Sequence, residues 1–120
     1  MLQSFKQLKT WRAAHNLVLS IYSNTKSFPK EEKFGLISQI RRAAVSIPAN
    51  IAEGRSRYGI KEFLRFLYIS RGSLEEVKYL LILSKDLGFL ANDSYSQLED
   101  QTDETGRLLN AMINSLKVKL

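Results

Sequence analysis

The sequence predicts an all-α fold, an antiparallel up-down-up-down four-helix bundle. Apolar residues recur at three- and four-residue steps along most of the 120-residue chain, which is the period of an amphipathic helix. No stretch sustains the alternation of apolar and polar residues that half-buried strands require. The segments between the periodic stretches are short, so successive helices run antiparallel. The length and the 44% hydrophobic content are those of one globular domain, residues 1–120.

The first predicted helix spans residues 5–25 and presents a wide apolar face. Its two apolar rows are Leu8, Trp11, His15, Val18 and Tyr22, and beside them Ala14, Leu17 and Ile21. A short connection leads to Pro29, which suits the first turn of the next helix because its fixed φ is already helical.

The second predicted helix spans residues 30–53 and carries a stripe of isoleucines on one face. Pro48 lies inside this helix. Because proline has no backbone N–H, the carbonyl of Ala44 loses its helical partner and a kink is expected. Gly54 is predicted to end the helix. Residues 55–59 then form a basic linker.

The third and fourth predicted helices span residues 60–87 and 94–118. Two apolar stripes run along the third helix, more than one neighbouring helix can cover, and Gly88 is predicted to end it. The segment Ser94–Gln97 has the spacing of a capping box, which predicts the start of the fourth helix. Acidic residues near that start and lysines near its end match the helix dipole.

The composition excludes several classes of site. There is no cysteine, which excludes disulfides, thiolate catalysis and cysteine-ligated zinc. A single histidine cannot form a multi-histidine metal site within one protomer, and no cofactor is predicted. The longest uncharged run, Ala13–Thr25, has 13 residues, too few for a membrane span, and the N-terminus lacks the apolar core of a signal peptide. We expect a cytoplasmic protein with no membrane partner.

The net charge of +6 is unevenly distributed along the chain. Residues 1–73 hold 13 basic and 4 acidic residues, whereas residues 74–120 hold 5 and 8. A basic half favours a polyanionic partner such as nucleic acid, although a solvated surface is the alternative. The candidate nucleic-acid-binding residues are Arg41, Arg42, Arg55, Arg57, Lys61 and Arg65. Tyr58 and Tyr68 lie near them in the sequence and could stack on bases.

A polar wedge runs beside the isoleucine stripe of the second helix. Its members are Gln39, Arg42, Ser46, Asn50 and Glu53. At 3.6 residues per turn they fall within roughly a quarter of a turn. The wedge could be a groove that receives a ligand or partner, or a structural network that satisfies the carbonyl freed by Pro48. We favour the structural interpretation.

His15 is the one candidate general base of its type. It lies between Trp11 and Tyr22 on the apolar side of the first helix, and no orienting partner can be identified for it. We therefore interpret His15 as a hydrogen-bonded core residue and expect no enzymatic activity. The specific catalytic alternative is a ribonuclease that uses this histidine.

Residues 39–54 read QIRRAAVSIPANIAEG. This run resembles the signature of a bacterial four-helix bundle family whose founding members are encoded in intervening sequences of large-subunit ribosomal RNA genes. Further segments match the family at the same spacings, namely Phe28-Pro29 with the following Glu32, Phe34, Gly35 and Leu36, then Lys61–Phe63, Phe66-Leu67, Gly72–Leu74 and Asp86–Gly88. The resemblance covers nearly the whole chain.

The resemblance implies a protomer of a barrel-like homo-oligomer, because relatives form homopentamers of four-helix protomers. A related branch contains the accessory variability protein of diversity-generating retroelements, which binds nucleic acid and partners a reverse transcriptase. Together with the charge, this favours a non-enzymatic, oligomeric nucleic-acid-binding bundle, with RNA favoured over DNA. The alternative is a protein-interaction scaffold or an accessory subunit of a polymerase such as a reverse transcriptase, in which the basic residues only steer association.

Overall fold

The computed structural model describes residues 4–120, and four long helices make up most of them. They are α1 (Lys9–Thr25), α2 (Leu36–Ser56), α3 (Ile60–Asp86) and α4 (Asn92–Lys117). Two short 3-10 helices, η1 (Phe5–Gln7) and η2 (Lys30–Glu32), precede α1 and α2. No strand occurs between residues 4 and 120, and the predicted all-α fold is confirmed.

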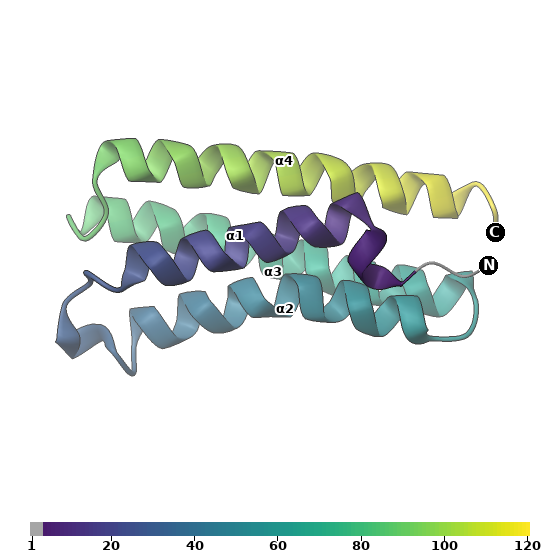
Figure 1. The fold of residues 1–120 in the computed structure, drawn as a ribbon, viewed down its shortest axis with the longest axis horizontal. Coiled ribbons are helices and arrows are strands. Elements are labelled where there is room, and N and C mark those ends of the chain that lie inside the picture. Colours follow the sequence, from purple (N-terminus) through teal and green to yellow (C-terminus); the bar gives the residue numbers. More distant parts are fainter. Residues whose placement is uncertain (1–3) are drawn as a thin grey trace.

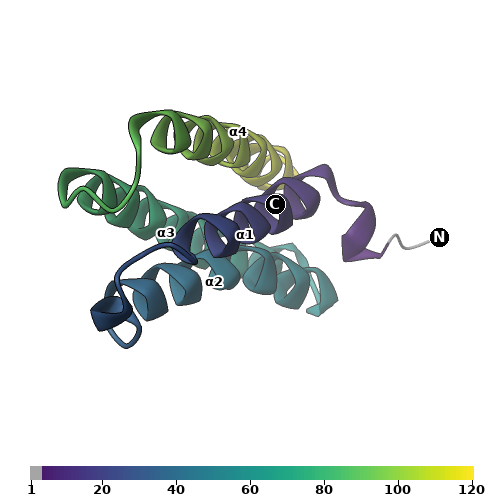
Figure 2. The same cartoon turned by 60° about the vertical axis from the view of Figure 1, so that its left-hand side comes forward.

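The helices run antiparallel and form an elongated bundle that measures 45 × 24 × 21 Å (Figure 1). Each helix packs against the next one in the chain, and α4 packs against α1, which closes the ring. The backbones of the diagonal pairs α1–α3 and α2–α4 do not approach each other closely in the described chain. Figure 2 shows the bundle obliquely, with α4 above α1 and α3 and with α2 below them. The predicted four-helix bundle is confirmed.

The core forms where the apolar stripes of the four helices meet. Twelve large side chains are almost fully buried, namely Leu17, Ile21, Ile40, Ile47, Ile51, Leu67, Leu74, Val77, Leu80, Leu98, Leu109 and Ile113. Each contributes about 1.5–3 kcal/mol relative to an exposed side chain. The row of α1 that includes Tyr22 lies at the edge of this core, since Tyr22 is 39% exposed, whereas Ala14, Leu17 and Ile21 are fully buried. Within residues 4–120, none of the helices has the length and apolar character needed to cross a bilayer.

The first two long helices begin later than the sequence predicts. Leu8 is extended (φ −74°, ψ 126°), so it separates η1 from α1, which begins at Lys9 rather than Phe5. In the same way, α2 begins at Leu36 rather than at the end of the Pro29 connection. The backbone N–H of Leu36 donates to the Glu32 carboxylate at 3.1 Å. This bond satisfies one of the free amides of the first turn, which places the helix start here.

The end of α3 is the predicted glycine stop. Gly88 has φ 82°, in the left-handed region that favours glycine. The N–H of Phe89 donates to the carbonyl of Ser84, and the N–H of Gly88 donates to the carbonyl of Lys85, both at 2.9 Å. These two bonds form a Schellman motif, which satisfies carbonyls that the helix end leaves without a partner.

The predicted capping box at the start of α4 is wrong. Ala91 is extended (φ −66°, ψ 154°), and the helix begins at Asn92 without a side-chain cap. Ser94 therefore lies inside the first turn instead of preceding it. Leu90, just before this start, is only 5% exposed. Burial of Leu90, rather than a capping side chain, positions the entry of the chain into α4.

The prediction that Gly54 ends the second helix is also wrong, because α2 continues to Ser56. Gly54 is buried where α2 crosses α3. A Cβ atom at this position would lie 2.7 Å from the Cβ of Phe66 and 3.0 Å from the ring of Phe63. The missing side chain therefore allows the two helices to approach each other closely, and the backbone here is not left-handed.

We expect Gly54→Ala to lower the free energy of unfolding by about 1–3 kcal/mol, the usual cost of overpacking. Gly72 in α3 is the matched control, because a Cβ there would meet no atom within 4 Å. Gly72→Ala should raise the free energy of unfolding by about 0.5–1 kcal/mol, since alanine is the better helix former. Urea denaturation followed by circular dichroism measures both changes. Equal effects at the two positions would contradict the close-approach interpretation.

Candidate functional site

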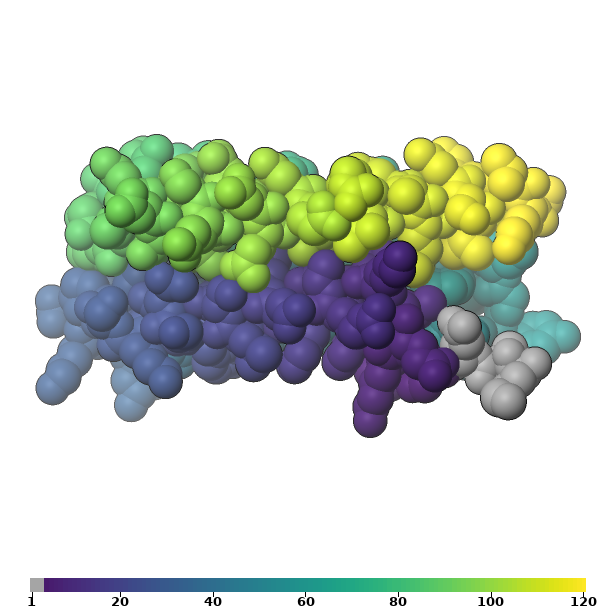
Figure 3. All heavy atoms as spheres, turned by 45° about the horizontal axis from the view of Figure 1, so that its top comes forward, coloured from purple at the N-terminus to yellow at the C-terminus, as the bar shows by residue number. Residues whose placement is uncertain are grey.

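One end of the bundle gathers the excess positive charge. The α2–α3 turn, η1 and the last turns of α4 lie at this end, as Figures 1 and 3 show. Residues 4–12, 53–65 and 114–120 form what we call the basic end, and they include nine lysines and arginines against two glutamates. At the opposite end, residues 22–38 and 82–99 include four basic and five acidic residues. The protein is therefore electrostatically polar along its long axis.

Four of the six predicted nucleic-acid-binding residues surround the α2–α3 turn. They are Arg55, Arg57, Lys61 and Arg65. The turn itself is short, because Gly59 has φ 92° and ψ 155°, a conformation that side chains disfavour. This tight reversal places the last turn of α2 beside the first turns of α3, so that charges from both helices lie together.

Arg57 and Arg65 lie against the ring of Phe66. Their guanidinium carbons are 5.1 and 4.5 Å from its centroid. Each arginine also forms a surface ion pair, Arg57 with Glu53 at 3.3 Å and Arg65 with Glu62 at 3.1 Å. The hydrogen bond from Arg65 lowers the pKa of Glu62. These contacts hold both guanidinium groups in place and partly balance their charge.

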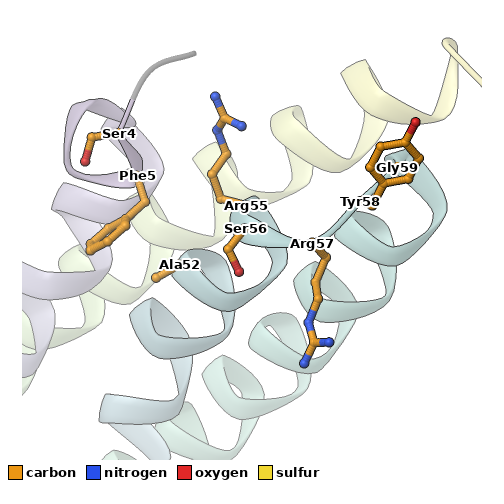
Figure 4. A pocket seen from close by; sticks show the side chains of 8 residues that line it. All are labelled: Ser4, Phe5, Ala52, Arg55, Ser56, Arg57, Tyr58 and Gly59. Atoms are coloured by element: carbon orange, nitrogen blue, oxygen red, sulfur yellow. The ribbon is translucent and has the colours of Figure 1, made fainter.

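Arg55 and Lys61 carry charges that are not balanced in this way. Neither forms an ion pair with any residue that the structure describes. Figure 4 shows Arg55 and Arg57 pointing away from each other, from neighbouring positions at the end of α2. Arg55 and Lys61 are therefore the cations at the α2–α3 turn that an anionic ligand would meet without displacing a glutamate.

A hollow with a volume of about 510 Å³ opens beside this turn (Figure 4). It is lined by Ser4, Phe5, Ala52, Arg55, Ser56, Arg57, Tyr58 and Gly59. The lining includes apolar side chains, hydroxyl groups and two arginines, of which Arg57 directs its guanidinium group away from Arg55, toward Phe66 and Glu53. The hollow therefore offers both charge and an aromatic surface at the basic end.

Arg41 and Arg42 lie elsewhere, although the sequence groups them with the other candidates. The Nε of Arg41 donates to the hydroxyl of Thr25 at 2.9 Å, and its guanidinium carbon lies 4.4 Å from the centroid of the Tyr22 ring. Arg41 thus links α2 to α1. Arg42 is exposed, and about 20 Å of helix separates it from Arg55. The structure does not bring these two arginines to the basic end.

Comparison with known proteins supports the fold and the family resemblance carried by residues 39–54. A model of the family described as 23S rRNA-intervening sequence protein matches residues 6–111. The chain belongs to this family. The resemblance in the sequence is thereby confirmed, although the relation to retroelement accessory proteins stays a prediction.

A solved structure supports the same fold for this family member. The chain is similar to a protein of unknown function from the S23 ribosomal protein family of Bacteroides thetaiotaomicron VPI-5482, with a TM-score of 0.80. The two chains are 22% identical, and the similarity covers 88% of this chain and 95% of the other. At that identity the likeness establishes the fold alone. No curated protein matches the chain.

In this family member, the polar wedge divides into two parts. The hydroxyl oxygens of Ser46 and Ser73 are 2.8 Å apart and join α2 to α3. Asn50 donates to the carbonyl and to the hydroxyl of Ser46, at 2.8 and 3.0 Å. The remaining members are exposed, namely Gln39, Arg42 and Glu53. The inner part of the wedge therefore contributes to helix packing, while the outer part faces solvent.

The hydrogen bond at the proline of α2 differs from the predicted one. Pro48 frees the carbonyl of Ala44, but the hydroxyl of Ser70 donates to the carbonyl of Ile47 at 2.9 Å. Ser70 is fully buried on α3. The hydroxyl that supports this part of α2 therefore comes from the neighbouring helix and not from the wedge.

His15 is not the hydrogen-bonded core residue that the sequence suggests. Its ring is half-buried and stacks on the Trp11 indole, with centroids 4.9 Å apart and planes 7° apart. Both rings line an almost wholly apolar hollow of about 370 Å³ between α1 and α2. Among residues 4–120, no three side chains of the histidine, cysteine or carboxylate type are grouped so that they could hold a metal ion.

The sequence does not identify four lysines at the basic end as binding candidates. They are Lys6, Lys9, Lys117 and Lys119. They lie far from residues 55–65 in the sequence, and only the antiparallel packing of the helices brings them to the same end. Lys117 and Lys119 give a signal in the sequence, but it indicates a favourable helix dipole rather than a partner.

The different surroundings of Arg41 and Arg42 give a test. Arg41→Ala should lower the free energy of unfolding by about 1–2 kcal/mol, because it removes a cation–π contact and a hydrogen bond between helices. Arg42→Ala, at the exposed neighbouring position, should change it by less than about 0.5 kcal/mol. Urea denaturation midpoints at constant m-value measure the difference. Equal destabilisation by the two substitutions would refute the structural role of Arg41.

Proposed function

We propose that this family member is a non-enzymatic, oligomeric protein that binds nucleic acid, RNA in preference to DNA, through the basic end. The observation that supports binding is the concentration of nine cations against two glutamates in residues 4–12, 53–65 and 114–120. The phosphate backbone attracts such a surface, and its counterions are released on contact. The family name refers to intervening sequences of 23S rRNA, which supports RNA as the ligand.

Arg55 and Lys61 would make the first phosphate contacts, because neither is paired with a carboxylate among the residues that the structure describes. Arg57 and Arg65 would also bind phosphate, each by exchanging its glutamate partner for a phosphate oxygen. That exchange costs little, since exposed ion pairs of this kind contribute only about 0–1 kcal/mol. The predicted absence of catalysis is part of the proposal, so bound RNA should be recovered uncleaved.

We also propose that several copies assemble, as the family resemblance implies, into a homopentamer. The support is apolar surface that one bundle leaves exposed. Leu19 is 55% exposed on α1, Val45 40% on α2, and Ile69 and Ile82 40% and 42% on α3. Val45 also lines the apolar hollow between α1 and α2. Assembly of several copies would cover these side chains, as contacts between proteins cover exposed apolar surface.

The same apolar surface supports the second candidate function, a scaffold or an accessory subunit of a polymerase such as a reverse transcriptase. In that case α1, α2 and α3 would contact another protein, and the basic end would only steer the encounter. Co-purification of one stoichiometric protein after nuclease treatment would favour the scaffold. A nuclease-treated oligomer that carries no other protein would favour the nucleic-acid-binding function.

Removal of two positive charges from either end of the bundle tests nucleic-acid binding. We expect the double substitution Arg55→Gln, Lys61→Gln to weaken RNA binding by about tenfold near physiological salt and to reduce the slope of log K against log salt by roughly 1.5. The matched control, Lys30→Gln with Lys33→Gln, removes the same charge from the opposite end. It should change affinity less than about twofold. Fluorescence anisotropy with labelled RNA and DNA measures both, and equal losses in the two variants would refute a localised site.

Assembly is tested by size-exclusion chromatography with light scattering. The mass expected is five times the 13.7 kDa of the protomer. Val45→Glu should dissociate the assembly, because it places a charge in an apolar contact. Gln97→Glu, at an exposed polar position on α4, should leave the mass unchanged. A monomeric unmodified protein at micromolar concentrations would contradict the proposal.

A further inference from the structure

Tyr58 stands at the tip of the α2–α3 turn and is 99% exposed. Figure 4 shows its ring beside the start of α3, and Tyr58 lines the hollow together with Arg55 and Arg57. A single exposed aromatic side chain is ordinary on a protein surface. This one differs because cationic side chains flank it on both sides in the sequence and because the hollow opens beside it. An exposed aromatic face among cations is the arrangement that binds an unstacked base.

The hollow has the dimensions and the chemistry for one nucleotide. Its volume of about 510 Å³ lies within the usual range of small-molecule sites. Phe5 and Ala52 supply apolar surface, and the guanidinium group of Arg55 supplies positive charge without a carboxylate partner. A phosphate and a base could therefore both be accommodated at one place.

The backbone at the rim of the hollow also favours the binding of a phosphate. Gly59 precedes α3, and a Cβ at Gly59 would meet no atom within 4 Å, so the chain can be approached closely here. The first amides of the 27-residue helix α3 follow directly. Free amides and the positive end of the helix dipole favour a phosphate at this position. Together with the side chains, they complete a site for a sugar-phosphate segment.

We propose that this hollow binds one unpaired nucleotide of single-stranded nucleic acid, with the base on Tyr58 and the adjoining phosphate on Arg55. The inference rests on the proposed function and narrows its ligand from nucleic acid in general to unpaired strands. A duplex would offer its phosphates to the basic end, but its bases are stacked and cannot reach Tyr58. Single strands should therefore gain from Tyr58 and duplexes should not.

The structure supplies its own reporter for occupancy of the hollow. Phe5 lines it, and the Phe5 ring lies edge-on to Trp11 with centroids 5.1 Å apart. Trp11 is the one tryptophan in the sequence. A nucleotide bound in the hollow changes the surroundings of Phe5, which lines it, so the emission of Trp11 should change in a saturable way during titration with single-stranded RNA.

The decisive experiment compares Tyr58→Ala with Tyr58→Phe in binding to an unstructured RNA oligonucleotide and to an RNA duplex. Tyr58→Ala should weaken binding of the single strand by about fivefold or more, since it removes the stacking surface. It should leave duplex binding and the salt slope unchanged, because no charge is lost. Tyr58→Phe should bind like the unmodified protein.

Phe34 supplies a matched control at the other end of the bundle. It is 89% exposed and, like Tyr58, lies between a basic residue and a glycine. Phe34→Ala should leave both affinities unchanged. Because neither aromatic side chain is buried, thermal unfolding of all the variants should match that of the unmodified protein.

The outcomes separate this inference from the proposed function. If Arg55→Gln, Lys61→Gln loses RNA while Tyr58→Ala binds the single strand normally, the nucleotide site is refuted and the basic end stands. Equal loss of single strand and duplex in Tyr58→Ala would also refute it. If the unmodified protein binds RNA and DNA single strands equally and Tyr58→Ala loses both, the nucleotide site is supported and the preference for RNA is overturned. If the unmodified protein binds no nucleic acid at low salt, the proposed function is refuted, and the nucleotide site is refuted with it.

Discussion

The close approach of α2 and α3 at Gly54 is the constraint on which the candidate site depends. Because Gly54 has no side chain, the Cβ of Phe66 can lie against the backbone of α2. The two helices can then be joined by a short turn, and Phe66 becomes a surface for Arg57 and Arg65. A wider separation would remove these contacts and would move the charges of α3 away from those of α2.

Antiparallel packing turns a modest charge excess into a polarised molecule. The start of α1, the α2–α3 turn and the end of α4 meet at one end of a bundle that is 45 Å long. This distance is several Debye lengths at physiological salt, so each end acts on a ligand separately. The local glutamates offset only part of the field, because Glu53 and Glu62 pair with Arg57 and Arg65 while seven further cations remain in excess at the basic end.

The bundle buries one side of each helix and leaves other apolar surface without a cover. The largest buried side chains come from all four helices and face a common axis. Outside this core, Trp11 and His15 stack over the hollow between α1 and α2, and isoleucines of α3 remain partly exposed. The core of one chain is therefore complete, while its outer surface has an apolar character suited to further packing.

Local patterns in the sequence are enough to predict the four helices, the face that each one buries and the family. Helical periodicity is strong in all four segments, and the isoleucine stripe of α2 is buried as its spacing predicts, with Ile40, Ile47 and Ile51 at 0% exposure. Gly88 also ends α3 as predicted, because a left-handed stop is a local property of glycine. These features depend on neighbours within a few residues, which a sequence displays directly.

The roles of individual residues, in contrast, depend on how the helices pack. Arg41 and Arg42 are equivalent in the sequence, yet one contacts α1 and the other faces solvent, because adjacent positions on a helix point about 100° apart. The sequence predicts that Gly54 ends a helix, but Gly54 allows α2 and α3 to approach each other closely. The sequence indicates that Lys117 interacts with the helix dipole, and the fold places the end of α4 at the basic end. Such roles depend on groups that are distant in the chain. Only packing places those groups side by side.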